Sequence, residues 1–184
     1  MLEITEGFIT YIKVAFFAGI FISSPWIFHQ LWKFVAPGLY QQEKKFALPF
    51  VISSTFLFLL GSSFAYWVVF PIGFSFLLKY AGPSITATLS MKKAFSFTMR
   101  MILVFGIVFQ LPVLVFALSK LGLVTSKMLI RSHRYVIVII FILSAILTPP
   151  DIATQLIMAI PLLFLFELSI LIAWIFGKKE KNII

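Results

Sequence analysis

The sequence contains no cysteine and only six acidic residues among 184, against 15 lysines and arginines. Without cysteine there is no disulfide framework, no thiolate metal site and no cysteine nucleophile. Charged residues make up 11% of the chain, whereas soluble domains carry roughly 25%. Hydrophobic residues make up 61%. A soluble domain of this length leaves roughly a third of its surface exposed and could not hide so much apolar surface. The composition therefore indicates an integral membrane protein.

The usual catalytic and cofactor-binding motifs are also missing. The sequence has no HExxH, no GxSxG and no glycine-rich phosphate loop. Its two histidines, His29 and His133, have no serine, cysteine or carboxylate at a recognisable spacing, which favours ordinary interfacial roles over catalysis or metal binding. The net charge of +9 is explained by basic loops beside a membrane and does not call for nucleic acid. We therefore expect no enzymatic activity, no cofactor, no metal site and no nucleic-acid partner.

Five apolar segments follow one another without a linker long enough to separate domains. They are Phe8–Phe28, Phe46–Phe70, Ala94–Leu118, Tyr135–Leu147 and Ile152–Phe176. Residues 1–184 are therefore expected to form one membrane-embedded domain, an all-α polytopic helix bundle. The first segment would span about 31 Å, close to the hydrocarbon core of a bilayer. The fourth would reach only about 20 Å, which implies bilayer thinning or burial against neighbours.

The connections between these segments carry the turn signals. Pro71–Lys93 contains several glycines and prolines and is expected to be a connector whose first part lies on the membrane surface. Lys120–Arg134 is expected to be a basic loop that turns at Gly122. Thr148–Asp151 contains two prolines and must form a tight turn. Within the segments, the prolines are expected to kink the helices. These prolines are Pro25, Pro112 and Pro161.

The distribution of lysine and arginine predicts the orientation in the membrane. The loops 29–45, 119–134 and 177–184 together carry ten of these residues, whereas the connections on the opposite side carry three. Because positive loops stay in the cytoplasm, this count places the C-terminus inside and the N-terminus outside. No cleavable signal peptide is visible at Met1. An external N-terminus without a targeting sequence leads us to expect that a preceding helix is missing.

Arg100, Gln110 and Glu167 lie well inside the apolar segments, whereas Lys13 lies near the start of the first segment, where it can extend to the interface. An ionisable group near the middle of a bilayer costs roughly 2.5–3.5 kcal/mol, so each needs an explanation. Glu167 either finds a partner inside the bundle, such as Arg100 or a backbone donor, or contacts a substrate or partner protein. Gln110 precedes Pro112 by two residues and can hydrogen-bond the carbonyl that the proline leaves free.

One stretch carries a long ordered pattern. From Ser23 to Glu43 the residues fit S-x-P-x-x-x-x-Q-x-W-x-F-x-x-P-x-L-x-x-x-E, with a turn signal at Pro37-Gly38. This pattern closely resembles the signature of the TatC family, the large subunit of the twin-arginine protein translocase. Further resemblance lies at Gln110–Pro112 and at the turn Thr148–Asp151, so that it covers nearly the whole chain. Family members begin with a cytoplasmic segment and one more helix, which would make six spans.

The resemblance implies a binding site in the loop from Phe34 to Glu43, including Pro37 and Tyr40. In the family this loop helps to recognise the paired arginines of the signal peptide. Glu43 suits that role, because a carboxylate binds a guanidinium through two parallel hydrogen bonds that lysine cannot reproduce. The alternative is that Glu43 only forms a surface ion pair with a nearby lysine or with Arg131, worth about 0–1 kcal/mol.

The resemblance also implies partners. Polar residues on the last hairpin help the family to dock small single-span subunits of the TatA and TatB type, and here they are Thr148 and Gln155. The alternative is that Thr148 and Asp151 cap the helix at Ile152 while Gln155 satisfies a backbone group. At Gln110 the family often has an acidic residue, so a role that needs charge there does not carry over.

The function expected from the resemblance is protein export. The chain would bind twin-arginine signal peptides of folded cargo and form a homo-oligomeric complex with the single-span subunits in the bacterial cytoplasmic membrane or an organellar membrane. One alternative is a proton-coupled transporter of small solutes that uses Arg100, Gln110 and Glu167 as an intramembrane path. Another is a purely structural assembly subunit, for which Glu43 would be dispensable.

The topology can be tested by labelling, because the chain has no cysteine of its own. Single cysteines introduced at Ser84 and at Asn182 are expected to react with an impermeant maleimide from opposite sides of the membrane, with Ser84 accessible from outside. Intact and permeabilised cells would be compared for each variant. Labelling of both positions from the same side would refute the five-segment topology.

Overall fold

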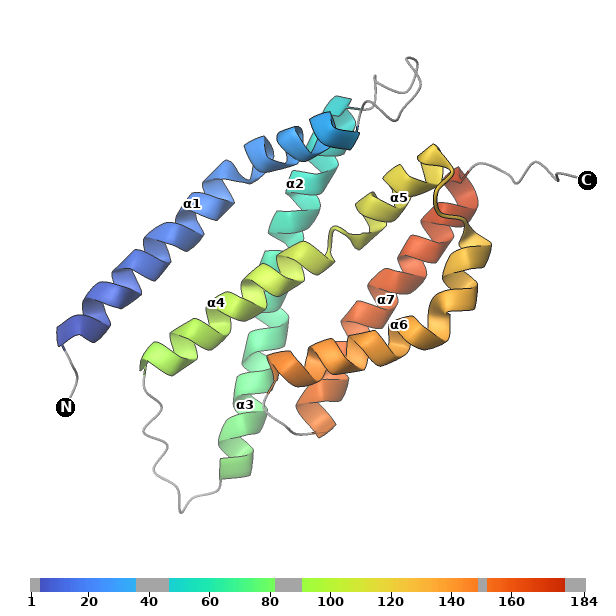
Figure 1. Cartoon of the computed structure of the whole chain (residues 1–184). Coiled ribbons are helices and arrows are strands. Elements are labelled where there is room, and N and C mark those ends of the chain that lie inside the picture. Colours follow the sequence, from blue (N-terminus) through green and yellow to red (C-terminus); the bar gives the residue numbers. More distant parts are fainter. Residues whose placement is uncertain (1–3, 36–46, 82–90, 149–151, 178–184) are drawn as a thin grey trace, which may run out of the picture.

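The computed structural model describes residues 4–35, 47–81, 91–148 and 152–177, which form a bundle of helices (Figure 1). The elements are α1 (Ile4–Val35), α2 (Ala47–Phe64), a π-helical turn η3 (Ala65–Val69), α3 (Phe70–Ala81), α4 (Met91–Val108), α5 (Leu111–Leu121), α6 (Ser126–Leu147) and α7 (Ile152–Phe176). No strand occurs among these residues. Five stretches are long and apolar enough to cross a membrane, so the predicted all-α polytopic bundle is confirmed.

The second span continues further than the sequence predicted. The connector expected to begin at Pro71 is helical as far as Ala81, because α2, η3 and α3 follow one another without a gap. At the end of the π turn, the Phe70 amide donates to the carbonyl of Ala65, five residues back. This wider turn rearranges the backbone bonding directly before Pro71, which has no amide hydrogen to donate. The helix can therefore pass the proline, and the prediction of a surface connector from this point was wrong.

The fourth span is also longer than predicted. Helix α6 begins at Ser126, not at Tyr135, and its 22 residues extend about 33 Å, so it is no short arm. Its start is fixed by Thr125, whose hydroxyl accepts a hydrogen bond from the Met128 amide at 3.3 Å. Lysine and arginine, which made this stretch look like a loop, are good helix formers. Neither bilayer thinning nor a loop as far as Arg134 is required.

The third predicted segment consists of two helices that meet at a break. The Gln110 amide donates to Ile107 three residues back, and Pro112 lies in the first turn of α5, where its missing amide costs least. Helix α5 ends at Gly122, whose φ of 79° is left-handed and favours glycine, as the predicted turn there requires. In contrast, α1 and α7 remain helical through Pro25 and Pro161.

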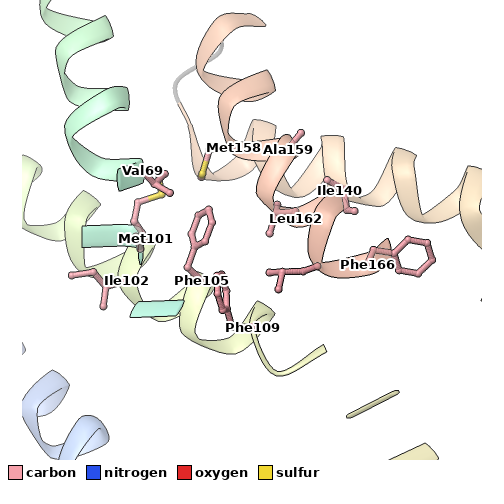
Figure 2. Packing of buried hydrophobic residues seen from close by; sticks show 12 residues of the cluster. Val69, Met101, Ile102, Phe105, Phe109, Ile140, Met158, Ala159, Leu162 and Phe166 are labelled. Carbon is pink, nitrogen blue, oxygen red and sulfur yellow. The ribbon is translucent and has the colours of Figure 1, made fainter. Parts of the chain in front are cut away.

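The buried core joins the middle of the chain to its last helix. Figure 2 shows side chains of α4 and α7 facing one another, with Phe105 fully buried between them. The cluster comprises Ala65, Val69, Met101, Ile102, Phe105, Phe109, Ile140, Met158, Ala159, Leu162, Leu165 and Phe166. Among the described side chains of α1, Phe21 packs against this cluster without being fully buried, and most of the other apolar side chains are exposed. A helix that is apolar on all sides is typical of a membrane span that faces lipid.

Helices α2 and α4 approach closely through small residues. A Cβ atom added to Gly106 would lie 2.7 Å from both the Phe58 ring and the Ser62 hydroxyl, and one added to Gly61 would lie 2.7 Å from the Phe105 carbonyl oxygen. The Ser62 hydroxyl also donates to the Ile102 carbonyl at 3.3 Å. Membrane helices associate through such close packing and interhelical hydrogen bonds, because lipid supplies no hydrophobic drive.

Filling this contact is expected to loosen the bundle. Gly106→Val places a branched side chain where no space exists, and we expect it to lower the free energy of unfolding in detergent by about 1–3 kcal/mol. The matched control is Gly19→Val, since a Cβ at Gly19 has no neighbour within 4 Å. Thermal unfolding followed by circular dichroism would compare the two. Equal stability of both variants would show that the α2–α4 contact does not hold the bundle together.

Candidate functional site

The two helices that flank residues 36–46, α1 and α2, pack against each other at the ends nearest to this segment. Trp32, in the last turns of α1, is buried and its ring packs on Phe50 in the first turn of α2, with centroids 4.4 Å apart. The rings of Phe28 on α1 and Phe58 on α2 form a second contact further from residues 36–46, with their centroids 5.8 Å apart. Figure 1 shows α1 and α2 meeting at this end of the molecule. The segment that carries the predicted site is therefore attached at both ends to a rigid pair of helices.

Most of the predicted signal-peptide residues lie in this segment. Pro37, Tyr40 and Glu43 are outside the residues that the structure describes, and Phe34 lies in the last turn of α1. The structure consequently fixes the base of the loop, whereas the role of Glu43 itself stays a prediction.

An apolar groove lies next to this base and was not anticipated from the sequence. Its volume is about 400 Å³, and α2, α5 and α7 form its walls. The lining residues are Pro49, Phe50, Ser53, Leu57, Pro112, Val113, Phe116, Leu168, Ile172 and Phe176. Phe50 belongs both to this lining and to the Trp32 contact, so the groove begins where the loop is anchored. Three helices far apart in sequence build it, and no local pattern could have revealed it.

Within the described part of the chain, Lys120 lies beside the aromatic end of the groove. The Lys120 ammonium lies 5.8 Å from the ring centroid of Phe116 and 5.9 Å from that of Phe176. Both rings line the groove, and their faces attract the ammonium group. Lys120 is in the last turn of α5, where a positive charge also complements the helix dipole. The site thus has apolar walls and a positively charged edge.

The Gln110 side chain bonds backbone carbonyls at the break between α4 and α5 and is not part of an open polar site. Its side-chain amide donates to the Ser54 carbonyl on α2 at 3.1 Å and to the Gly106 carbonyl at 3.4 Å. The Gly106 carbonyl would normally accept from the Gln110 backbone amide, which bonds Ile107 instead. A backbone group left free inside a membrane needs a new partner, and this side chain provides it.

The predicted docking residues are also engaged inside the chain. The Thr148 hydroxyl is buried and donates to the Ser144 carbonyl at 2.8 Å, so Thr148 closes the end of α6 and does not start α7. The Gln155 amide donates to the Phe141 carbonyl at 2.9 Å and ties α7 to α6. These bonds give both residues a structural role, and docking of a partner stays a prediction.

Glu167 has a partner that the sequence did not indicate. Its carboxylate lies 2.6 Å from the His133 ring nitrogen, and the same ring stacks on Phe166 with centroids 5.7 Å apart. The expectation that His133 lacks a carboxylate partner was wrong, since 34 residues of separation hide the pair from any spacing rule. Arg100 forms no ion pair with Glu167, whose partner is on α6.

The described residues provide features that suit the binding of a ligand. No group of three or more histidines, aspartates or glutamates within the described ranges could hold a metal ion. What they do provide is a rigid anchor for the Glu43 loop, an apolar groove that begins at that anchor, and a lysine at the groove's edge. Such an arrangement suits a ligand that is charged at one end and apolar along its length.

Comparison with known proteins places the chain in a family. A family model described as Sec-independent protein translocase protein (TatC) matches residues 1–161. TatC of Desulforapulum autotrophicum is 46% identical over 177 residues, which are 96% of this chain and 66% of that protein. TatC of Helicobacter pylori strain J99 is 48% identical over 177 residues, or 96% of this chain and 71% of that protein. This chain therefore spans about two thirds of the length of such relatives.

A solved structure agrees with these sequence matches. The crystal structure of the twin arginine translocase receptor TatC in DDM superposes with a TM-score of 0.85 at 39% identity, covering 94% of this chain and 77% of that one. The helical arrangement and the sequence signature thus point to the same relatives. The chain belongs to the TatC family of Sec-independent protein translocase proteins.

Proposed function

We propose that the chain acts in the twin-arginine translocase, where it binds the twin-arginine signal peptide of folded cargo and assembles with small single-span subunits. The observation that carries this proposal is the anchored base of the Glu43 loop beside an apolar groove. Family membership supports it. We further infer a place in the bacterial cytoplasmic membrane, with the N-terminus of this chain outside and the C-terminus in the cytoplasm, from the count of basic residues.

Electrostatics make Glu43 the residue that would receive the arginine pair. The sequence around it is basic, with Lys33, Lys44 and Lys45 close by, and would repel a positively charged peptide. One carboxylate in such surroundings creates a local site for a guanidinium, which it binds through two parallel hydrogen bonds. Phe34, Pro37 and Tyr40 would shape this site around Glu43. A lysine presents a point charge without the planar fork, which explains selection for arginine.

The groove is suited to the part of the peptide that follows the arginines. Signal peptides carry an apolar stretch of roughly 7–15 residues after their charged beginning. The groove runs along α2 from Pro49 to Leu57, about 12 Å at the helical rise, which matches the shorter of these stretches. Its walls are almost entirely apolar, so burial of an apolar segment is favourable there. The loop and the groove would thus bind consecutive parts of one ligand.

The single-span subunits would dock on the α6–α7 hairpin. Gln155 is half-buried there, and one of its two side-chain N–H groups donates to the Phe141 carbonyl, so its amide oxygen and its second N–H are the groups that a partner helix would meet. Thr148 would act indirectly by fixing the end of α6. Several copies of the chain would join such a complex.

The arrangement of polar residues gives the transporter alternative no support. Gln110 is bound to backbone carbonyls, and Glu167 pairs with His133 between α6 and α7. Neither of them contacts Arg100, so the described residues form no continuous polar path across the bundle.

Removal of the charge on Glu43 tests the binding site. Glu43→Gln keeps the shape of the side chain, and we expect a loss of signal-peptide affinity of about ten- to a hundredfold, since a charged hydrogen bond contributes about 1.5–3 kcal/mol. Glu43→Asp should fall between, because its carboxylate survives but retreats by one methylene. Affinity would be measured in detergent with a fluorescent signal peptide. The control is Glu180→Gln, and unchanged binding in Glu43→Gln would reduce Glu43 to a surface ion pair.

Filling the groove tests the second part of the ligand site. Val113→Trp projects a large ring into the groove, and we expect it to weaken binding of the complete signal peptide by about tenfold through lost apolar burial. A short peptide with the arginine pair but no apolar stretch should bind both forms equally. The neighbouring Leu114→Trp is the matched control, because Leu114 is half exposed on α5 and does not line the groove. Equal effects of the two substitutions would exclude the groove as the site.

A further inference from the structure

We propose that Lys13 on α1 and Arg100 on α4 form a binding site for the phosphate of an anionic phospholipid, at the end of the bundle opposite the Glu43 loop. Both residues are cations within membrane spans, and the site is distinct from the groove between α2, α5 and α7. The inference rests on the positions of these two residues, on the Lys13–Ser96 hydrogen bond and on the exposure of Arg100, and it does not require the proposed function.

The two side chains enter the membrane from the same end. Figure 1 shows α1 and α4 starting at one end of the bundle and running side by side in the same direction. Lys13 lies six residues inside the span that begins at Gly7, and Arg100 lies five residues inside the span that begins at Phe95. At the helical rise both Cα atoms are about 7–9 Å beyond the start of their spans. Because both spans start at the same end of the bundle, we place the two residues at similar depths near the polar boundary of the bilayer.

A hydrogen bond between the helices aligns them. The Lys13 ammonium donates to the Ser96 hydroxyl on α4 at 3.1 Å, although the two residues are 83 positions apart. The lysine is therefore directed toward α4 and is only partly exposed. This bond uses one of the three donors of the ammonium group, so that two remain for another ligand.

Arg100 borders the same place. It follows Ser96 by four residues and therefore lies on the same face of α4, one turn further into the membrane. Side chains on a helix lean toward its N-terminus, so we expect the guanidinium to extend back toward the turn that contains Ser96. Arg100 is exposed and pairs with no carboxylate whose side chain the structure describes. Ser96 thus joins Lys13 to the face of α4 that also carries Arg100, and we infer that the two cations share this surface.

A lipid phosphate is the anion that this position can reach. A cation at this depth is costly unless it is paired, and two neighbouring cations repel each other. Phospholipid phosphates lie at the bilayer boundary, and basic pockets between membrane helices bind anionic head groups. Arginine adds a planar fork that matches phosphate oxygens. One acyl chain would then lie along α1, whose apolar side chains are largely exposed beside Lys13, including Ile12 and Phe16.

Local enrichment of lipid would test this site. A fluorophore on Ile9→Cys, one turn from Lys13 on α1, would report quenching by brominated phosphatidylglycerol or brominated phosphatidylcholine at equal fractions in vesicles. Ile9 is exposed, and the chain has no other cysteine. We expect stronger quenching by phosphatidylglycerol, which would show that this lipid is enriched beside Lys13. This enrichment should fall by about fivefold in Lys13→Met, and by about fivefold in Arg100→Met. Arg100→Lys should keep part of the enrichment.

The controls separate this site from general attraction of lipid to a basic protein. Lys120→Met removes a cation at the other end of the bundle and should leave quenching unchanged, and circular dichroism would establish that all variants are folded. Inorganic phosphate should not displace the lipid. Equal quenching by both lipids, an equal loss in Lys120→Met, or competition by inorganic phosphate would each overturn the proposal. Loss of enrichment only in the Lys13 and Arg100 variants would support it.

Discussion

Several polar side chains that this chain places inside the membrane find a partner within the bundle, and these contacts shape much of the fold. The break between α4 and α5 leaves a carbonyl free, and Gln110 bonds it. Ser62 and Thr148 donate to backbone carbonyls, and the carboxylate of Glu167 meets His133. Because an unpaired polar group in hydrocarbon costs several kcal/mol, these side chains hold the helices in one arrangement.

Because of these contacts, the polar residues inside the membrane have structural roles, and we expect the ligand to bind elsewhere. The intramembrane polar residues Gln110, Thr148 and Glu167 form contacts within the chain, so we expect ligand binding at the Glu43 loop and at the apolar groove beside its base. The Trp32–Phe50 contact connects these two parts, since it joins the helices on both sides of the loop and Phe50 also lines the groove. A rigid scaffold that presents a charged loop beside an apolar surface is a common way to bind a peptide of mixed character.

The sequence predicted the class, the five spans and the last helix, Ile152–Phe176, because long apolar runs have few alternatives. It failed where a local signal was ambiguous. The basic residues at 127–134 led to the prediction of a loop, although Thr125 caps a helix that begins there. Pro71 led to the prediction that the helix ends, although a π turn before it lets the helix continue. The groove and the His133–Glu167 pair could not be predicted from the sequence, because both are formed by residues that come together only in the folded chain.

The central claim is that the Glu43 loop of this TatC family member contacts the arginine pair directly, and a double-mutant cycle tests it most directly. Binding would be measured for the chain and its Glu43→Gln form, each with a twin-arginine signal peptide and with the same peptide carrying paired lysines. Direct contact predicts a coupling free energy of about 1–3 kcal/mol, because the second change costs little once the first is made. Additive losses, with no coupling, would contradict the account.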